Sequence, residues 1–352
     1  MKELTVAVEG FRLWNAGIPQ FRKVFMRDSF ISLLINPDIQ FLKSHLEFAI
    51  LKQGKKQDPL TGEEPGKIFH EYPGFEMNGL LTTYNACDTT ALFLMALDKY
   101  VELANDSSFV QEHKESIGAA AGYILSHLWE GLFYEDPALC NAERFALDCT
   151  YWKDGQFVGR KEASYPVCYS LVHIQNMRGL FCAARLLGMD AWREKAEEMR
   201  RNIARLVDKD GFFLIYDTKG GVSANNSDNL HALFYLEPGD IDAAVIKSIS
   251  DSSRRLASVC GYRTLDPSFN FKLQKKSYDY FRTVWPFEQA MIYMGAEKHG
   301  LKEVTQVASR VVGFLESEPE FLLVEGNSAS PGGCNPQLWT WAAKEFFRGK
   351  IK

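Results

Sequence analysis

Acidic, amide and large aromatic residues recur in six segments that each precede an apolar stretch of the chain. Asp154 follows Trp152 in "YWKDG", and Glu320 ends the acidic run "ESEPE". In "VFMRDSF", Arg27 and Asp28 stand before an apolar run, where a charged pair is costly to bury without compensating partners. Aromatic rings stack on the apolar faces of sugars, while carboxylates and guanidinium groups bind hydroxyls. These residue types predict a carbohydrate site, because no glycine-rich phosphate-binding loop accompanies them.

Each candidate also has a purely structural interpretation. Asp28 suits the N-cap of the helix that follows it. Asp154 precedes a glycine, and Asp-Gly is a common turn pair. Glu320 belongs to an acidic run of the kind that is usually solvated. The elements that position these residues therefore decide between the two interpretations.

Composition excludes several classes of function. The chain has 352 residues with a net charge of −5, and no basic run suits nucleic acid. It shows no secretory signal and no apolar stretch of about 18 residues, so we expect no membrane span. Seven cysteines, odd in number and without a CxxC pair, indicate reduced thiols in a cytoplasmic protein. We also expect no metal and no cofactor, because histidines and cysteines do not cluster.

Helical periodicity dominates the rest of the sequence. Stretches that are apolar nearly all round alternate with amphipathic, charged ones, as when a buried inner helix is followed by an outer helix. The inner helices are expected to begin near residues 29, 88, 166, 228, 286 and 336. Helices are predicted over 88–104, 107–129, 166–188, 190–207, 227–236, 239–259, 286–300, 301–317 and 336–349. Strand signals are limited to two minor hairpins, in "TVAVEGF" and "GFFLIYD".

Six such pairs predict an all-α fold, an (α/α)6 toroid formed by a single domain over residues 1–352. In such a ring, the loops before the inner helices converge on one cavity. The six chemically distinctive segments are those loops.

Six motifs resemble a known family in the same order along the chain. They are "VFMRDSF", "GKIFHE", "YNACDTTALFLMAL", "YWKDG", "YFRTVWP" and "GGCNPQLWTWAA". Together they resemble the amylo-α-1,6-glucosidase domain of glycogen debranching enzymes and its bacterial and archaeal relatives, from about residue 20 to 345. The resemblance implies a glucoamylase-like toroid that hydrolyses with inversion. Debranching proteins usually carry further domains ahead of the toroid, which favours either small substrates or a partner chain here.

The resemblance also implies roles for individual residues. Asp154 is the implied general acid and Glu320 the implied general base, with Glu318 and Glu325 as alternatives for the base. Arg27 and Asp28 are implied to bind the outer hydroxyls of the terminal glucose. The residues expected to contact substrate are Arg27, Asp28, Tyr84, Asp88, Trp152, Lys153, Trp285 and Gln337.

The predicted function is an inverting, exo-acting hydrolase of α-glucosides, with α-1,6 linkages among the candidates. Its partner would be an oligosaccharide or small glucoside, and the oligomeric state stays open. Two alternatives remain at this point. A sugar epimerase on the same toroid would use His70, His173 or His231 for proton transfer, and a non-catalytic protein would bind carbohydrate without paired carboxylates.

Overall fold

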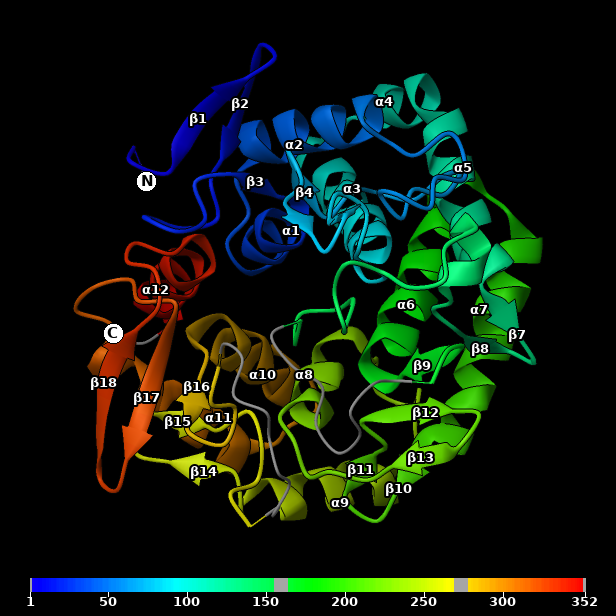
Figure 1. Cartoon of the computed structure of the whole chain (residues 1–352). Coiled ribbons are helices and arrows are strands. Elements are labelled where there is room, and N and C mark those ends of the chain that lie inside the picture. Colours follow the sequence, from blue (N-terminus) through cyan, green and yellow to red (C-terminus); the bar gives the residue numbers. More distant parts are fainter. Residues whose placement is uncertain (1, 155–163, 269–277, 351–352) are drawn as a thin grey trace.

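Six helices form a closed inner ring in the computed structural model, which describes residues 2–154, 164–268 and 278–350 (Figure 1). The inner helices are α1 (Met26–Ile35), α3 (Thr89–Ala104), α6 (Ser170–Leu187), α8 (Asp228–Tyr235), α10 (Pro286–Lys298) and α12 (Leu338–Lys350). Each packs against the next in chain order, and α12 packs against α1. This closure confirms the helical ring that the repeat pattern predicts.

An outer layer surrounds most of this ring. It consists of α2 (Ile39–Leu51), α4 (Ser107–Glu112), α5 (Lys114–Ser126), α7 (Asp190–Asn202), α9 (Ala243–Ser253) and α11 (Lys302–Ala308), with the 3-10 turns η1 (Pro137–Cys140), η2 (Ile203–Leu206) and η3 (Ser309–Phe314). Outer helix α7 buries only Ala196 and Met199, whereas inner helix α10 is buried along most of its length. The two layers therefore follow the predicted alternation of amphipathic and wholly apolar helices.

The sixth repeat departs from the expected helix pair. Among the described residues, no outer helix follows α12. Instead Trp14, on the second strand of the N-terminal hairpin, packs against α12 and α2. Its ring centroid lies 6.1 Å from that of Trp341 and 4.1 Å from that of Phe41. The hairpin thus takes an outer position beside α12.

Short antiparallel strands make the fold mostly helical rather than purely α. The strands are β1 (Thr5–Val8), β2 (Phe11–Trp14), β3 (Val24–Phe25), β4 (Glu71–Tyr72), β5 (Glu76–Met77), β6 (Leu80–Leu81), β7 (Leu128–Trp129), β8 (Leu132–Phe133), β9 (Val167–Tyr169), β10 (Val207–Asp208), β11 (Gly211–Phe212), β12 (Ile215–Asp217), β13 (Gly220–Val222), β14 (Ala257–Ser258), β15 (Gly261–Tyr262), β16 (Thr283–Val284), β17 (Phe321–Glu325) and β18 (Ser328–Gly332). They pair as two-stranded ribbons, apart from the three-stranded sheets β13-β12-β9 and β16-β17-β18.

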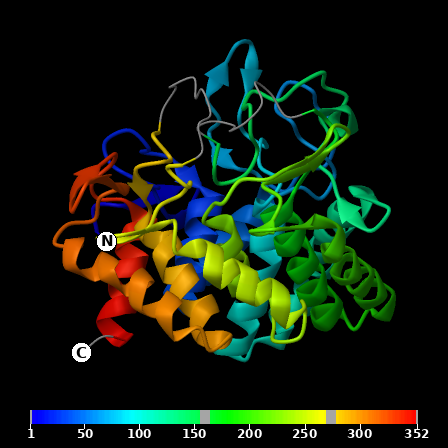
Figure 2. The ribbon, with the colours of Figure 1, turned by 90° about the horizontal axis from the view of Figure 1, so that it is seen from below.

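Three of these strands lead directly into inner helices and tie their loops to distant segments. β3 precedes α1 and pairs with β4, and β9 precedes α6 and pairs with β12. β16 precedes α10 and pairs with β17, with Val284 opposite Leu322. This register brings the loop of Trp285 beside the segment that contains Glu320. Figure 2 shows the helices on one side of the molecule and the loops and hairpins on the other.

Several helix limits differ from the prediction for local reasons. The helix predicted over 166–188 begins only at Ser170, because residues 167–169 form β9; it stops at Gly188, with φ +66°, as predicted. The helix predicted over 107–129 is divided at His113 into α4 and α5. The first predicted minor hairpin is β1-β2. The second prediction was wrong in its pairing, because "GFFLIYD" contains β11 and β12, which pair with β10 and with β9 and β13 rather than with each other.

The cysteines and the lengths of the helices bear on two expectations from composition. All seven cysteines are buried and free of disulfides. Within the described part of the chain, no helix is both long and apolar enough to cross a membrane.

Candidate active site

A cavity at the loop end of the ring contains about 430 Å³ of space not filled by protein atoms, part of it open to solvent. Its lining comes from loops and helix ends that are far apart in the sequence. The lining residues are Ala16, Phe21, Phe25, Arg27, Asp28, His70, Trp152, Asp154, Tyr278, Trp285, Glu320, Gln337 and Trp339. Seven of the ten predicted site residues therefore meet at one cavity: Arg27, Asp28, Trp152, Asp154, Trp285, Glu320 and Gln337.

Arg27, at the start of α1, is the centre of the polar network beside the cavity. Its Nε donates to both carboxylate oxygens of Asp88, at 2.8 and 3.0 Å. Its Nη1 donates to Oδ2 of Asp154 at 2.7 Å and lies 3.1 Å from Nε2 of His70, and Nη2 donates to the Thr150 carbonyl at 3.3 Å. One buried guanidinium therefore ties α1 to α3 and to the Asp154 loop.

Asp154 combines burial with access to the cavity. Its side chain is 29% exposed, and Oδ2 accepts the bond from Arg27, whereas Oδ1 has no hydrogen-bond partner among the described residues. Burial raises its pKa to about 6; Arg27 opposes this rise, and the charges of Asp88 and Glu320 add to it. A carboxyl group with this pKa can carry a proton near neutral pH and donate it.

Glu320 lies in the loop before β17 and is held at both oxygens. Oε1 accepts a hydrogen bond from the Tyr278 hydroxyl at 2.6 Å, and Oε2 accepts one from the backbone N–H of Cys334 at 2.9 Å. The pKa of Glu320 is raised by burial, and the two donors oppose this rise because they stabilise the carboxylate. The fixed, hydrogen-bonded carboxylate suits a general base.

The other two glutamates considered for the base lie elsewhere. Glu318 is paired with Lys344, and Glu325 is 64% exposed and paired with Arg282. Neither lines the cavity.

Aromatic side chains form one wall of the cavity. Trp285 packs edge-on against Trp152, with ring centroids 5.9 Å apart and planes at 82°, and against Trp339 at 5.5 Å and 87°. Phe287 supports Trp339 from behind in a stacked contact at 4.3 Å. These rings offer the flat apolar surface that a sugar ring requires.

Asp28 and Gln337 form a polar edge of the same cavity. Nε2 of Gln337 donates to Oδ1 of Asp28 at 3.3 Å, and Oε1 of Gln337 has no partner among the described residues. Burial raises the pKa of Asp28 well above its usual value, although Arg27 opposes the rise. Asp28 does not form the helix cap that was its structural alternative, because the N-cap position of α1 is Phe25.

Three predicted substrate contacts are not among the cavity-lining residues. The Tyr84 hydroxyl donates to the Lys52 carbonyl at 2.7 Å. Asp88 is buried behind Arg27 and serves as its counter-ion. Lys153 is buried and points to Asp228, 3.0 Å away. Gly155, which completes the "WKDG" motif, lies outside the described residues.

The cavity also contains residues that were not predicted as site residues. Tyr278 precedes Trp285 in an aromatic-rich loop, and that composition was the available signal. His70 stands in "GKIFHE", where a paired loop histidine and glutamate was the simpler interpretation. Burial and the adjacent Arg27 charge hold the pKa of His70 well below its usual value, so the ring is neutral. Phe21 and Phe25 carried no signal beyond their apolar character.

The remaining histidines considered for an epimerase lie away from the cavity. His173 accepts from the Phe133 N–H at 3.2 Å through Nδ1, and its Nε2 lies 3.0 Å from the Met199 carbonyl, so it is a bonded core histidine. His231 is fully buried and lies 3.0 Å from the sulfur of Met291. Among the described residues, His70 is the histidine that lines the cavity.

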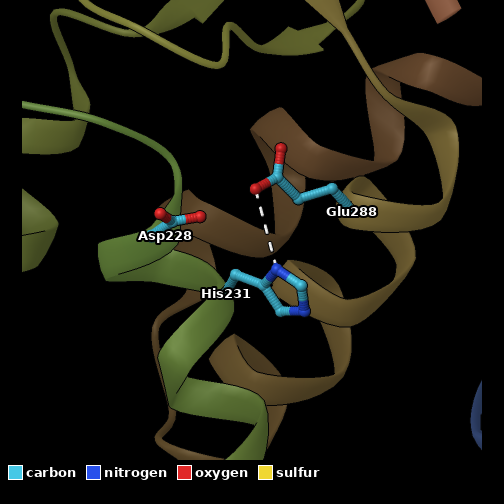
Figure 3. A group of neighbouring side chains, drawn as sticks. All are labelled: Asp228, His231 and Glu288. Atoms are coloured by element: carbon cyan, nitrogen blue, oxygen red, sulfur yellow. Dashed lines mark ion pairs between the residues drawn. The ribbon is translucent and has the colours of Figure 1, made fainter. Parts of the chain in front are cut away.

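Asp228, His231 and Glu288 form a buried group with metal-ligating atoms within 4.8 Å of one another (Figure 3). Nδ1 of His231 faces Oε1 of Glu288 at 3.7 Å. Asp228, however, already accepts bonds from three neighbouring donors, one of them the ammonium of Lys153. That positive charge disfavours a cation at the same carboxylate, so we assign no metal to this group.

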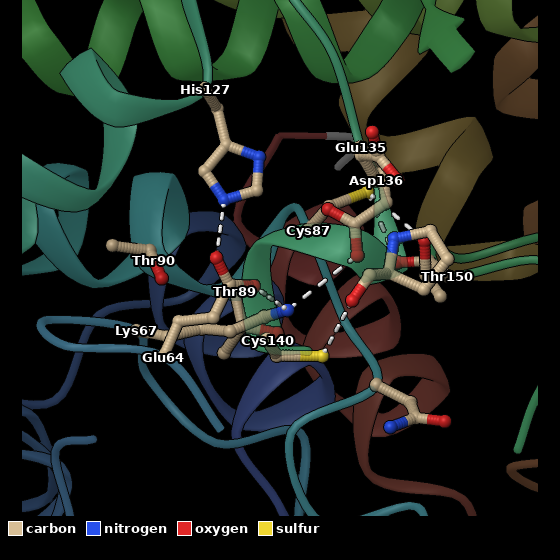
Figure 4. Close-up of polar contacts among 12 residues, drawn as sticks. Glu64, Lys67, Cys87, Thr89, Thr90, His127, Glu135, Asp136, Cys140 and Thr150 are labelled. Carbon is tan, nitrogen blue, oxygen red and sulfur yellow. Dashed lines mark hydrogen bonds and ion pairs between the residues drawn. The ribbon is translucent and has the colours of Figure 1, made fainter. Parts of the chain in front are cut away.

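A second buried charged network anchors loops of the second and third repeats (Figure 4). The Lys67 ammonium, fully buried, contacts Glu64 at 2.9 Å and Glu135 at 3.5 Å, and His127 contacts Glu64 at 2.8 Å. Burial raises the pKa of Glu64, but Lys67 and His127 outweigh it and lower the pKa to about 2. Lys67 precedes α3 and Glu135 precedes α6, so their contact connects the two repeats. The backbone of Glu135 is itself held by Val167 of β9.

Comparisons with known proteins identify the fold. No family model and no curated protein sequence matches this chain. Crystal structures of GH63 mannosylglycerate hydrolase from Thermus thermophilus are similar to it at 12% identity. Its complex with Tris gives a TM-score of 0.68 and that with Tris and D-glycerate 0.69, each covering 97% of both chains. Its complex with glucose gives 0.68, covering 96% of this chain and 95% of the other.

This likeness shows that the chain shares the (α/α)6 toroid fold of these structures. At 12% identity it shows the fold alone. The finer resemblance to amylo-α-1,6-glucosidases stays a prediction.

Proposed function

We propose that this chain is a glycoside hydrolase that removes one terminal hexosyl unit from a small α-glycoside, with inversion of configuration and within a single domain. The observation that supports it best is the pair of carboxyl groups, Asp154 and Glu320, which come from different repeats and line one cavity with Arg27 and Trp285. Glycosidic bonds are hydrolysed by such pairs, one acting as acid and the other as base.

In the proposed reaction, Asp154 donates the proton on Oδ1 to the glycosidic oxygen while Oδ2 stays bonded to Arg27. Glu320 removes a proton from a water molecule that attacks the anomeric carbon from the opposite face. Inversion requires the two carboxyl groups to be about 6.5–9.5 Å apart, which leaves room for that water. An α-glycoside would release the β-anomer.

Substrate selection in this proposal depends on the side chains that line the cavity. Asp28 and Gln337 would bind hydroxyls of the terminal sugar, and Trp285 would stack on its ring. The similar T. thermophilus enzyme hydrolyses mannosylglycerate, and it has been crystallised with glucose and with D-glycerate. We therefore include glucosides and mannosides of glycerate beside isomaltose, panose and limit dextrin as candidate substrates.

The test is a substrate screen with product anomers resolved by ¹H NMR. We expect at least one α-glycoside to release hexose first as the β-anomer. Asp154→Asn and Glu320→Gln should each lower the rate by about 10²–10⁴-fold. With α-glucosyl fluoride, whose leaving group needs little protonation, Asp154→Asn should regain activity and Glu320→Gln should not.

Other results would refute the proposal. Binding of sugars without turnover of any candidate would identify a carbohydrate-binding protein. Solvent deuterium incorporated into an otherwise unhydrolysed sugar, with activity that depends on His70 and survives Asp154→Asn, would identify an epimerase.

A further inference from the structure

The segment that ends in Asp154 contacts the carboxylate of Asp228 as well as Arg27. Asp228, the first residue of α8, accepts three hydrogen bonds or ion pairs from three consecutive residues. The Tyr151 hydroxyl donates to Oδ2 at 2.9 Å, the Trp152 indole Nε1 donates to Oδ1 at 2.8 Å, and the Lys153 ammonium lies 3.0 Å from Oδ1. All four side chains are buried.

The residues at the two ends of the same segment are held by other partners. The Thr150 carbonyl accepts bonds from Nη2 of Arg27 and from the backbone N–H of Cys87, at 3.3 and 2.8 Å. Asp154 itself accepts the 2.7 Å bond from Nη1 of Arg27. Residues 150 and 154 are thus fixed to α1, and the three residues between them are fixed to α8.

We propose that Asp228 is a positioning residue: its carboxylate holds Tyr151, Trp152 and Lys153 together and so sets the position of Asp154 and of the Trp152 wall. Asp228 does not line the cavity, so it acts through these neighbours rather than on the substrate. The inference rests on the proposed function for its catalytic consequence, but its structural part stands on the contacts alone.

The surroundings of Asp228 support a specific clamp rather than ordinary helix capping. The N-cap position of α8 is Ser227, which makes no side-chain cap bond, and the backbone N–H of Asp228 is satisfied by Oδ1 of Asn226. The same Asn226 oxygen accepts from Lys153 at 3.1 Å. The carboxylate of Asp228 is therefore used for the loop, and its bonds to the loop are of the strong, charge-assisted kind.

The expected consequence follows from the geometry of proton transfer. A displacement of the acid by about 1 Å costs roughly 10²-fold in rate. Asp228→Asn keeps the shape but leaves one acceptor oxygen for three donors. We expect kcat on the best substrate to fall by about 10²-fold. Because Arg27 lowers the pKa of Asp154, a looser contact should also move the basic limb of the pH profile to higher pH.

Two further variants separate positioning from charge neutralisation. Asp228→Asn leaves the Lys153 ammonium without its carboxylate, which destabilises the fold, and adding Lys153→Met removes that unpaired charge. The double variant should recover thermal stability while its rate stays low. Asp240→Asn is the matched control, because Asp240 forms an ion pair with Arg178, at 2.7 Å, beyond the other end of α8. It should leave the rate and pH profile unchanged.

The experiment combines pH–rate profiles with hydrogen exchange of the full-length chain. In Asp228→Asn, a peptide spanning 150–154 should exchange faster while peptides from α8 do not. The inference would be overturned if the basic limb of the Asp228→Asn pH profile stayed in place and its rate fell only in proportion to the folded fraction. It would also be overturned if the 150–154 peptide exchanged as slowly as in the unaltered chain, or if the double variant regained the rate of the unaltered chain. If the unaltered chain hydrolyses no glycoside, the proposed function fails, and the exchange result still decides whether Asp228 holds the loop.

Discussion

Replacing the proposed general acid should make the protein more stable above pH 6. The reason is the raised pKa of Asp154, which changes from 3.8 to about 6. Burial causes the rise, Arg27 reduces it, and Asp88 and Glu320 increase it. The ionised side chain is therefore less favourable in the folded protein than in the unfolded chain, and Asp154→Asn removes this cost because asparagine resembles the neutral acid.

The magnitude follows from the pKa difference. A rise from 3.8 to about 6 corresponds to roughly 3 kcal/mol, an upper value because the side chain is partly exposed. Below pH 3.8 both states bind the proton, so wild type and variant should differ little. Between pH 3.8 and 6 the folded protein keeps a proton that the unfolded chain loses, and wild-type stability falls as pH rises. Above pH 6 the difference is complete.

Thermal unfolding followed by circular dichroism at several pH values between 4 and 8 measures this effect. For 352 residues the unfolding entropy is about 0.7 kcal/mol/K, so 3 kcal/mol raises Tm by about 4 °C. The control is Asp251→Asn, at an exposed position where Lys247 lowers the carboxyl pKa, so its substitution should not raise Tm at pH 7. A Tm of Asp154→Asn at or below wild type at pH 8, or a pH-independent difference, would refute the reasoning.

Three further predictions concern the base and the buried network. Tyr278→Phe removes a donor that lowers the pKa of Glu320, so the acidic limb of kcat/KM should move to higher pH; a limb that stays in place contradicts this. Gly333→Ala puts a Cβ onto Oε2 of Glu320, so activity should fall by about 10²-fold. The control is Gly326→Ala, which is also at positive φ but places its Cβ in open space and should keep its activity. Equal rates of the two variants would contradict a catalytic role for Glu320 at this position. Lys67→Met leaves two buried glutamates without their cation, and we expect a loss of about 3–5 kcal/mol in urea unfolding at pH 7; an unchanged midpoint would show that the network contributes little.

Local patterns in the sequence predicted much of the helical framework. The alternation of wholly apolar and amphipathic stretches predicted the inner ring and its order, because burial on one or on all sides leaves a periodic record in the residues themselves. Helix ends were predicted well where they depend on one residue, as at Gly188. They were predicted less well where a strand pairs with a distant segment, as at residues 167–169.

In the candidate site too, some residues could be predicted from local sequence and others depended on distant contacts. Asp154, Glu320 and Trp285 could be singled out because their residue types suit carbohydrate chemistry and each precedes an inner helix. The sequence left Glu318 and Glu325 open beside Glu320. Only the tertiary contacts separate them, because Glu320 is bonded to Tyr278 and Cys334 beside the cavity, whereas Glu318 is paired with Lys344 and Glu325 with Arg282. Nor could it show that Asp88 is the buried counter-ion of Arg27, or that Lys153 points away from the cavity.

By itself, then, the sequence determined that the chain forms a ring of helices with acids and aromatic rings in the loops at one end. Only the tertiary structure decided which of those side chains face one cavity and which hold their neighbours in place, as Asp228 does for residues 151–153. The physical reason is the sequence separation over which each kind of interaction acts. Helical periodicity and capping act within a few residues, whereas the contacts that orient Asp154 join positions 61 to 127 residues apart.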